Sequence, residues 1–216
     1  MNAPSTPNST PLAYLEGFTW FYGRKFLITP NVLIPRPETE DIITASKTLC
    51  RESPCKILDL GTGSGIIAIT LALEIPKAII TATDISKAAL KIAHQNATLH
   101  NISNQIQFIH SNLFQGSTLK NQKYNIIAAN LPYVDQSWPW LDHQSLAHEP
   151  TIALFAPDHG LAIIKKFLTT ANNHLKPNGH ILLEADPSQH AQIIQFANRH
   201  HLKHVNTKNY ILHLQN

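Results

Sequence analysis

The most constraining feature of this sequence is a series of apolar runs in which polar and apolar side chains do not alternate. These runs are KILDL (56–60), AIITATD (78–84), IQFI (106–109) and YNIIAAN (124–130), and helix-length stretches separate most of them. A strand without alternation is covered on both faces, and such strands are typical of parallel sheets with helices above and below. The sequence therefore predicts an α/β fold with a mostly parallel sheet.

The remaining elements follow from helix and turn signals. A helix is expected to begin at a Thr39 cap, because Glu40 and Asp41 suit the positive end of a helix dipole. Further helices are predicted over 64–74, 86–100, 160–174, where Gly179 in LKPNG marks the stop, and 188–200. Strand HILLEAD (180–186) and a terminal antiparallel pair, KHVNT (203–207) with NYILHL (209–214), bring the expected sheet to seven strands.

The chain is expected to form one main domain, since 216 residues with 43% hydrophobic side chains can bury one substantial core. Residues 1–11 lack periodicity and are predicted to be a disordered tail. Residues 12–38 carry short extended pieces, KFLI and NVLI, around Thr29-Pro30, and are predicted to form a small hairpin or lid. The main domain is then 39–216, with a loop expected at 134–158.

Composition excludes several classes of function. The formal charge is +3, but Lys and Arg form no run, which argues against a dedicated nucleic-acid surface. No uncharged run reaches transmembrane length, and the start resembles no signal peptide. Cys50 and Cys55 show neither zinc spacing nor a disulfide framework, so we expect thiols in a reducing cytoplasm. The 13 histidines are scattered, and no metal site is expected. We expect a cytoplasmic monomer without membrane contact.

A glycine-rich turn predicts a cofactor site. In LDLGTGSG (58–65), Asp59 ends a strand and three glycines at alternate positions lead into a helix. Such glycines let a ligand approach the backbone and the unpaired N–H groups of the helix start. Asp84 ends the next strand, where a carboxylate can accept both ribose hydroxyls of a nucleoside. NAD would also fit this pair, but its fingerprint is G-x-G-x-x-G, whereas the G-x-G-x-G here is similar to that of class I S-adenosylmethionine methyltransferases.

The stretch NLPY (130–133) predicts a clamp for a planar amino group. It follows a strand whose carboxyl end faces the ligand side of the sheet. The side-chain oxygen of Asn130 and the carbonyl of Leu131 can each accept one hydrogen from an –NH₂ group. Pro132 fixes the chain so that the ring of Tyr133 covers the flat face of the target. This clamp suits an amide or an exocyclic base amine; the alternative is a strand-end turn with a packed tyrosine.

The chain resembles the bacterial peptide chain release factor N5-glutamine methyltransferases, the HemK/PrmC family. The resemblance covers roughly residues 12–190 and depends on six motifs. They are YLEGFTWFYGRKFLITPNVLIPRPETE (14–40), ILDLGTGSGIIAITLAL (57–73), ATDIS (82–86), NLPYV (130–134), HEPTIALFAPDHGL (148–161) and LKPNGHILLEA (175–185). It implies a class I, Rossmann-like methyltransferase fold, S-adenosylmethionine as cofactor, and a release factor as protein substrate.

The resemblance also assigns roles to residues. Asn130, Leu131, Pro132 and Tyr133 would hold the glutamine amide of a Gly-Gly-Gln loop, with Asn130 and Tyr133 as the catalytic pair. The cofactor-binding set implied by the resemblance is Asp59, Gly61, Thr62, Gly63, Ser64, Gly65, Asp84, Asn112, Leu113 and Asn130. The motif LIPRPETE (33–40) is either a rigid lead into a helix or a lid, with Glu38 and Thr39 near the cofactor.

Three departures from the family pattern keep other functions open. Leu131 replaces the first proline of N-P-P-Y, and NLPY also resembles the motif of ribosomal-RNA adenine dimethyltransferases, so an adenine N6-methyltransferase is one rival. Asn112 stands where the family commonly carries Asp near the adenine. The N-terminal helical domain of the family is expected to be missing, so a cofactor-binding module without substrate grip is the other rival. The aromatic WPW (138–140) is either a protein-docking ridge or an anchor of its own loop.

Overall fold

The computed structural model describes residues 10–50 and 54–216. A seven-stranded sheet in the order β5-β4-β3-β6-β7-β9-β8 forms its centre. The strands are β3 (Lys56–Leu60), β4 (Ile79–Asp84), β5 (Ile106–His110), β6 (Tyr124–Ala129), β7 (Leu175–Glu184), β8 (Lys203–Lys208) and β9 (Ile211–Gln215). Strands β3 to β7 run parallel, whereas β9 is antiparallel to both of its neighbours. The predicted mostly parallel sheet and its terminal antiparallel pair are confirmed.

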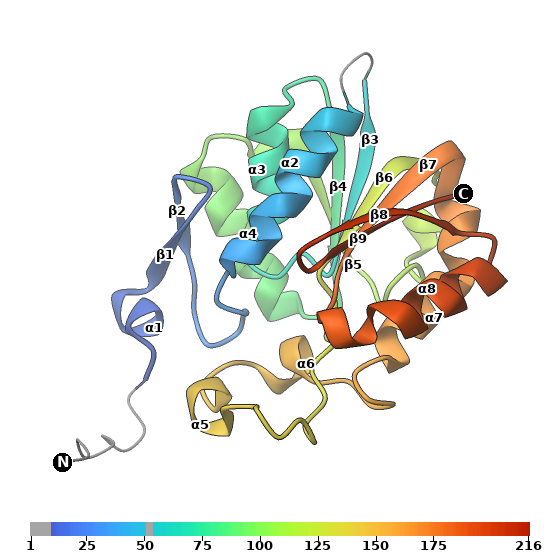
Figure 1. The fold of residues 1–216 in the computed structure, drawn as a ribbon. Helices are drawn as coiled ribbons and strands as arrows, with labels where there is room; N and C mark the ends of the chain where they lie inside the picture. Colours follow the sequence, from blue (N-terminus) through green and yellow to red (C-terminus); the bar gives the residue numbers. More distant parts are fainter. Residues whose placement is uncertain (1–9, 51–53) are drawn as a thin grey trace.

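Helices cover both faces of this sheet (Figure 1). One face carries α2 (Glu40–Leu49), α3 (Ile66–Glu74) and α4 (Lys87–Leu99), and the other carries α7 (Ala162–Ala171) and α8 (His190–Arg199). Neighbouring strand residues belong to different cores: Ile57 packs on the α2 and α3 side, and Leu58 packs on the α7 and α8 side. Because each strand contributes apolar side chains to both cores, apolar and polar residues do not alternate along it.

The chain enters the domain through α1 (Leu12–Glu16) and a hairpin of β1 (Phe18–Phe21) and β2 (Arg24–Leu27). The expected hairpin is present, but its turn lies earlier than predicted. Tyr22 and Gly23 both have a positive φ, as a tight two-residue turn requires. Residues 31–34, predicted as extended, form no strand and belong to a connecting strap that ends in η1 (Pro37–Thr39).

Several elements in the carboxyl-terminal half differ from the predicted ones. The expected loop at 134–158 contains two short helices, α5 (His143–Leu146) and α6 (Thr151–Leu154). Gly179 does not stop a helix: α7 ends at Ala171, and Gly179 lies inside β7, where the pairing with β6 is irregular. A Cβ there would lie 2.8 Å from the carbonyl of Lys176, so the irregular strand itself requires glycine. Short 3₁₀ helices complete the chain: η2 (Ser103–Gln105), η3 (Ser117–Leu119), η4 (Asn172–His174) and η5 (Pro187–Gln189).

The expectation of unpaired cysteines was wrong. Cys50 follows α2 and Cys55 precedes β3, and a disulfide joins them with their Cα atoms 5.7 Å apart. Because α2 packs beside α3, the end of α2 lies close to the start of β3, and the two cysteines are within bonding distance. Residues 51–53, between the two cysteines, and residues 1–9 of the predicted tail lie outside the described residues.

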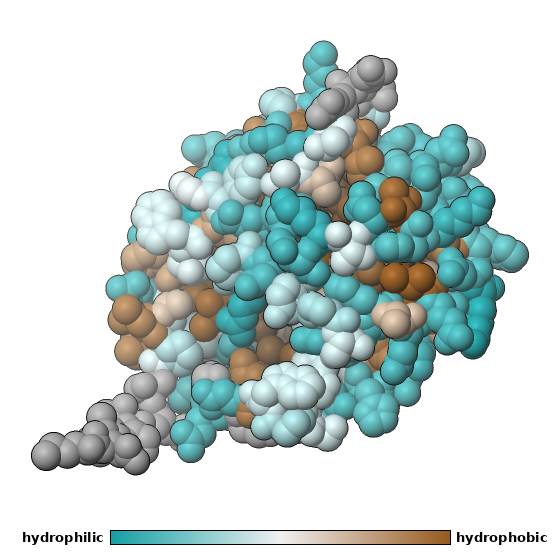
Figure 2. Space-filling model, in the orientation of Figure 1, coloured by the Kyte–Doolittle hydropathy of each residue, from teal (hydrophilic) through white to brown (hydrophobic). Residues whose placement is uncertain are grey.

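Figure 2 shows one face of the molecule, on which polar residues dominate and apolar ones form separate small groups. Within residues 10–50 and 54–216, no helix combines the length and apolar character needed to cross a bilayer. The apolar side chains are gathered mainly in the two cores on either side of the sheet.

Candidate functional site

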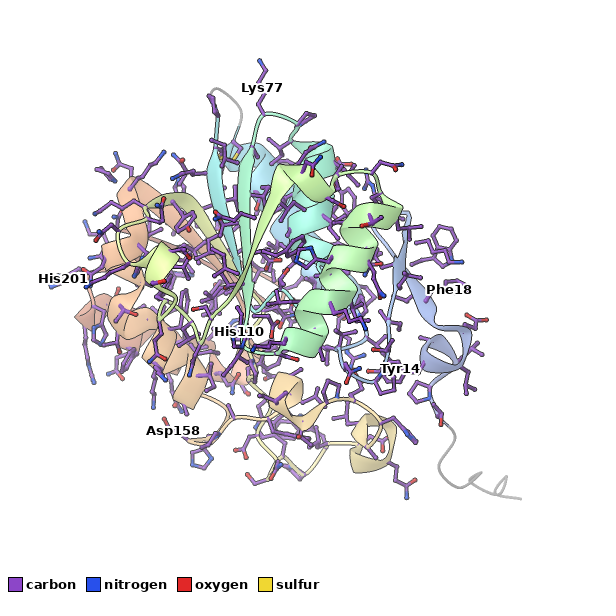
Figure 3. The ribbon with its side chains drawn as sticks, turned by 180° about the vertical axis from the view of Figure 1, so that it is seen from behind. Tyr14, Phe18, Lys77, His110, Asp158 and His201 are labelled. Carbon is purple, nitrogen blue, oxygen red and sulfur yellow. A yellow bond between two sulfur atoms is a disulfide. The ribbon has the colours of Figure 1, made fainter. Side chains whose placement is uncertain are left out.

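A cavity lies at the carboxyl ends of the parallel strands. Figure 3 shows the two ends of the strands: Lys77 precedes the amino end of β4, and His110, the last residue of β5, lies at the carboxyl ends, above Asp158. The cavity at these carboxyl ends has a volume of about 320 Å³. Open α/β sheets bind ligands at this edge, and the volume is in the range of small-molecule sites.

The structure brings most of the predicted site residues to this cavity. Its lining includes Gly61, Thr62, Gly63, Ser64, Asp84, Asn112, Leu113, Asn130, Leu131 and Pro132. Three predicted residues, Asp59, Gly65 and Tyr133, are outside the lining. Asp59 and Gly65 instead shape the glycine-rich turn, and Tyr133 contacts Glu184.

The glycine-rich turn follows β3 and is held against the neighbouring strand. Gly61, Gly63 and Gly65 all have a positive φ. The N–H groups of Gly61 and Thr62 both donate to the carbonyl of Thr83, at 2.9 and 2.8 Å. A Cβ on Gly65 would lie 2.9 Å from the side chain of Ile69, so this glycine permits the close packing at the start of α3 rather than contact with a ligand.

Asp59 supports the turn from below. Its side chain is fully buried, and its Oδ2 accepts hydrogen bonds from the hydroxyl of Thr62 at 2.6 Å and the N–H of Ala68 at 3.0 Å. Burial raises the pKa of Asp59 to about 7, although both donors oppose this rise. Asp59 therefore ties the turn to the first residues of α3.

Asp84 ends β4 with its carboxylate fixed at the cavity wall. Oδ2 accepts a hydrogen bond from the N–H of Gly63 and Oδ1 accepts one from the N–H of Ser86, both at 2.8 Å. Burial raises the pKa of Asp84, and these two N–H groups partly oppose the rise. Each carboxylate oxygen keeps a second lone pair, so the group can still accept two ligand hydroxyls.

Asn112 and Leu113 form the wall beyond β5. Leu113 has a φ of 50°, a conformation that a branched side chain rarely adopts. The hydroxyl of Ser111 donates to the carbonyl of Leu113 at 2.7 Å and accepts from the N–H of Gly116 at 2.8 Å. Strained backbone that its neighbours hold in place is typical of ligand sites.

The strap between β2 and η1 closes another side of the cavity and is anchored at both ends. Glu149, a buried residue before α6, accepts from the N–H of Ile34 at 3.0 Å and pairs with the guanidinium of Arg36 at 2.5 Å. Asn96 of α4 bonds with both backbone groups of Leu27 and donates to the carbonyl of Ser64. Sequence analysis missed Asn96, because a polar residue on the apolar face of a helix does not reveal its partner.

The predicted clamp residues meet a buried carboxylate that sequence analysis also missed. Asn130 follows β6, and its Nδ2 lies 3.2 Å from the hydroxyl of Thr39. Thr39 precedes α2 but makes no cap hydrogen bond there, contrary to the prediction, because its hydroxyl donates to Glu184 Oε2 at 2.6 Å. The hydroxyl of Tyr133 lies 3.4 Å from Glu184 Oε1, so Tyr133 contacts Glu184 rather than the cavity lining.

The residues present fit an adenosyl ligand. The turn at Gly61 to Ser64 offers a close backbone approach, Asp84 keeps two acceptor positions for ribose hydroxyls, and Asn112 offers amide groups to a base. Asn130 and Leu131 lie at the same cavity, on its far side from Asn112 in the strand order. A nucleoside ligand and a second reactant can therefore meet in one space.

This strand order and site define a methyltransferase domain with the class I, Rossmann-like fold. A family described as a methyltransferase domain matches residues 51–215. Among solved structures, the 16S rRNA N2 G1207 methyltransferase of T. thermophilus, in complex with AdoMet and guanosine, has a TM-score of 0.64. That match covers 92% of this chain and 48% of the other at 16% identity, so the likeness is one of fold.

Curated relatives narrow the family. The release factor glutamine methyltransferase of Neisseria gonorrhoeae is 39% identical over 186 residues, which cover 86% of this chain and 67% of the relative. The bifunctional methyltransferase of Rickettsia typhi is 40% identical over 205 residues, but the chain spans only 39% of its length. The chain belongs to the release factor glutamine methyltransferase family.

Proposed function

We propose that this protein uses S-adenosylmethionine to methylate the side-chain amide of the glutamine in the Gly-Gly-Gln loop of a peptide chain release factor. One observation carries the proposal: Asn130 and Leu131 line the same cavity as the glycine-rich turn and Asp84. The names of the relatives support the choice of substrate.

The cofactor would be held by residues already placed in the lining. S-adenosylmethionine, when bound, supplies an electrophilic methyl group on a sulfonium. Asp84 would accept the ribose hydroxyls, the turn from Gly61 to Ser64 would contact the methionine part, and Asn112 with Leu113 would contact the base. Asp59 and Gly65 take part by shaping the turn, since neither lies in the lining.

The clamp would position the nucleophile. The side-chain oxygen of Asn130 and the carbonyl of Leu131 can accept the two hydrogens of a planar amide, which orients its nitrogen toward the methyl group. Transfer would break the bond between the sulfur and the methyl carbon as the nitrogen bonds to that carbon, with S-adenosylhomocysteine as the leaving group and one amide proton released to water. Such alignment supplies much of the catalysis in a transfer that requires two reactants in line. Pro132 and Tyr133 complete the clamp in this proposal.

The surroundings disfavour the nucleic-acid rival. Residues 130–150, next to the clamp, contain no Lys or Arg but do contain Asp135, Asp142 and Glu149. Of the two cations in the cavity lining, Arg36 is paired with Glu149, which leaves Lys166 as the other. A polyphosphate substrate needs several cations at its binding surface, and an amide in a protein loop does not.

We propose a release factor as partner, action as a monomer in the cytoplasm, and a lid formed by residues 12–38 over a catalytic domain of residues 39–216. Trp140 is 64% exposed and stacks on Trp138, a few residues after the clamp in the sequence, which offers aromatic surface to a protein substrate. In a reducing cytoplasm the Cys50–Cys55 bond would be open.

The test is a labelling experiment with two candidate substrates and a blank. The protein is incubated with methyl-labelled S-adenosylmethionine and, separately, with a release factor, with structured RNA and with neither. Label in the release factor supports the proposal, and label in RNA supports the adenine rival. Calorimetry with Asp84→Ala tests the cofactor site: affinity is expected to fall by a factor of about ten to a hundred, since charge-assisted hydrogen bonds are lost.

A further inference from the structure

The buried carboxylate of Glu184 lies beside the clamp because of strand register. Strands β6 and β7 are parallel, with Ala129 opposite Leu183, so the next residues, Asn130 just after β6 and Glu184 at the end of β7, lie side by side. Thr39, at the end of η1, reaches over from the strap and lies between them. Two sheet strands and the strap thus meet at three polar side chains.

The donors and acceptors in the two hydrogen bonds that link Asn130, Thr39 and Glu184 are determined by the chemistry of these groups. An ionised carboxylate can only accept, so the single hydroxyl proton of Thr39 goes to Glu184 Oε2, 2.6 Å away. Thr39 then offers only lone pairs to Asn130, and an NH₂ group must face it, as the 3.2 Å contact of Nδ2 shows. The oxygen of Asn130 is left to point elsewhere, and Asn130 lines the cavity.

We infer that Glu184 and Thr39 are positioning residues, which hold the amide of Asn130 with its oxygen toward the substrate. The inference rests on the proposed function, in which that oxygen accepts a hydrogen of the substrate amide. Without the carboxylate, the hydroxyl of Thr39 can donate to the oxygen of Asn130 and turn an NH₂ group toward the substrate. Two donors would then face each other, and the nucleophile would not be held.

The cost of keeping this carboxylate supports a functional role. Glu184 is 1% exposed, and it forms no ion pair with a Lys, Arg or His side chain among the described residues. A buried anion without a cation is expensive. The titratable groups that act on it are Tyr133, which donates to Oε1, and Glu38 of η1, whose charge adds repulsion. Burial, with this repulsion, raises the pKa of Glu184 to about 7.

Protonation should therefore act like the loss of the carboxylate. A protonated Glu184 can donate to Thr39, which frees the proton of the threonine hydroxyl for the oxygen of Asn130. The rate at saturating substrate is expected to fall as the pH drops below about 7, while cofactor affinity changes little. A residue that only supports the fold would not give this profile.

The experiment compares kcat, KM and cofactor affinity of four single variants and one double variant from pH 5.5 to 8.5. Glu184→Gln and Thr39→Val remove the carboxylate and the hydroxyl at nearly constant size, and Glu16→Gln and Thr48→Val are matched changes at exposed positions. We expect both of the first pair to lower kcat about tenfold or more at pH 8, with cofactor affinity within a factor of three. The double variant should be no slower than the slower single one, because both act through Asn130.

Several results would overturn the inference. They are a kcat near that of the unmodified protein in Glu184→Gln, a fall in kcat below pH 7 that persists in that variant, or additive losses in the double variant. Rescue of Thr39→Val activity by Thr39→Ser is expected, because serine restores the hydroxyl. A failure of Thr39→Ser to restore at least part of the rate would count against the chain of hydrogen bonds.

A separate readout distinguishes this inference from the proposed function. If the unmodified protein labels no release factor, the proposed function fails, and the orientation of Asn130 is followed by NMR of its side-chain amide, assigned by loss of the signal in Asn130→Ala. Slow hydrogen exchange of one Nδ2 proton, lost in Thr39→Val, would still support the orientation. Equal exchange in both proteins would refute it.

Discussion

Replacement of Glu184 by Gln is expected to stabilise the fold at high pH even though it slows the reaction. The pKa of about 7 in the folded protein lies above the ordinary glutamate value of 4.5. Below about pH 4.5 the carboxyl carries a proton in both the folded and unfolded chain. Between 4.5 and 7 the folded chain keeps a proton that the unfolded chain releases, so this group lowers the free energy of unfolding as pH rises. Above pH 7 the loss is complete.

The magnitude follows from that interval. About 2.5 pH units at 1.36 kcal/mol each give about 3 kcal/mol as the upper limit of the cost of ionisation. Glutamine carries no charge and can still accept from Tyr133, so Glu184→Gln should regain part of this energy at pH 8 and little at pH 5. Urea unfolding of both proteins at pH 5, 6, 7 and 8 measures the difference, with Glu16→Gln as control. A difference that is independent of pH, or a variant less stable at pH 8, would refute the reasoning.

Three further predictions concern the supports of the site. Gly160→Ala is expected to lower the free energy of unfolding by about 3 kcal/mol or more, because its Cβ would lie 2.0 Å from the carbonyl of Tyr133 at a φ of 81°. The control Gly17→Ala, in open space at a φ of 74°, should cost about 1 to 2 kcal/mol. Equal losses in urea unfolding would argue against this close approach at Gly160. Glu149→Gln should speed cofactor dissociation about tenfold or more in stopped-flow measurements by releasing the strap at Arg36, and an unchanged rate would mean that the strap does not retain the cofactor. Reduction of Cys50–Cys55 should lower stability by about 2 kcal/mol or less, since the closed loop is short; a Cys50→Ser, Cys55→Ser protein should not respond to reductant, and any response would assign the effect to another cause.

The sequence was sufficient for the sheet and for residues that end its strands. Runs without alternation predicted strands covered on both faces, and the two cores confirm this. Asp84 and Asn130 could be found because a polar residue after a buried strand has a fixed location at the carboxyl edge. Glu184 follows the same rule at the end of HILLE, so its location at the carboxyl ends of the strands can also be predicted from the sequence.

Contacts between distant segments could not be predicted in this way. The partner of Thr39 is 145 residues away, and local sequence suggested a helix cap in its place. Asn96 and Glu149 hold the strap through hydrogen bonds to backbone groups of Leu27 and Ile34. Such bonds cannot be predicted from residue type, because all residues except proline offer the same backbone groups. The disulfide depends on how α2 packs beside the sheet, which the spacing of two cysteines does not reveal.

The most direct test of the account is the position of the methyl group. A release factor is incubated with the protein and S-adenosylmethionine, and the peptide that contains Gly-Gly-Gln is sequenced by mass spectrometry. The account predicts one added methyl group on the glutamine side chain, and a loss of on the order of a hundredfold or more in its rate of formation with Asn130→Ala. A methyl group on another residue, no methylation of the release factor, or near-normal turnover by Asn130→Ala would contradict it.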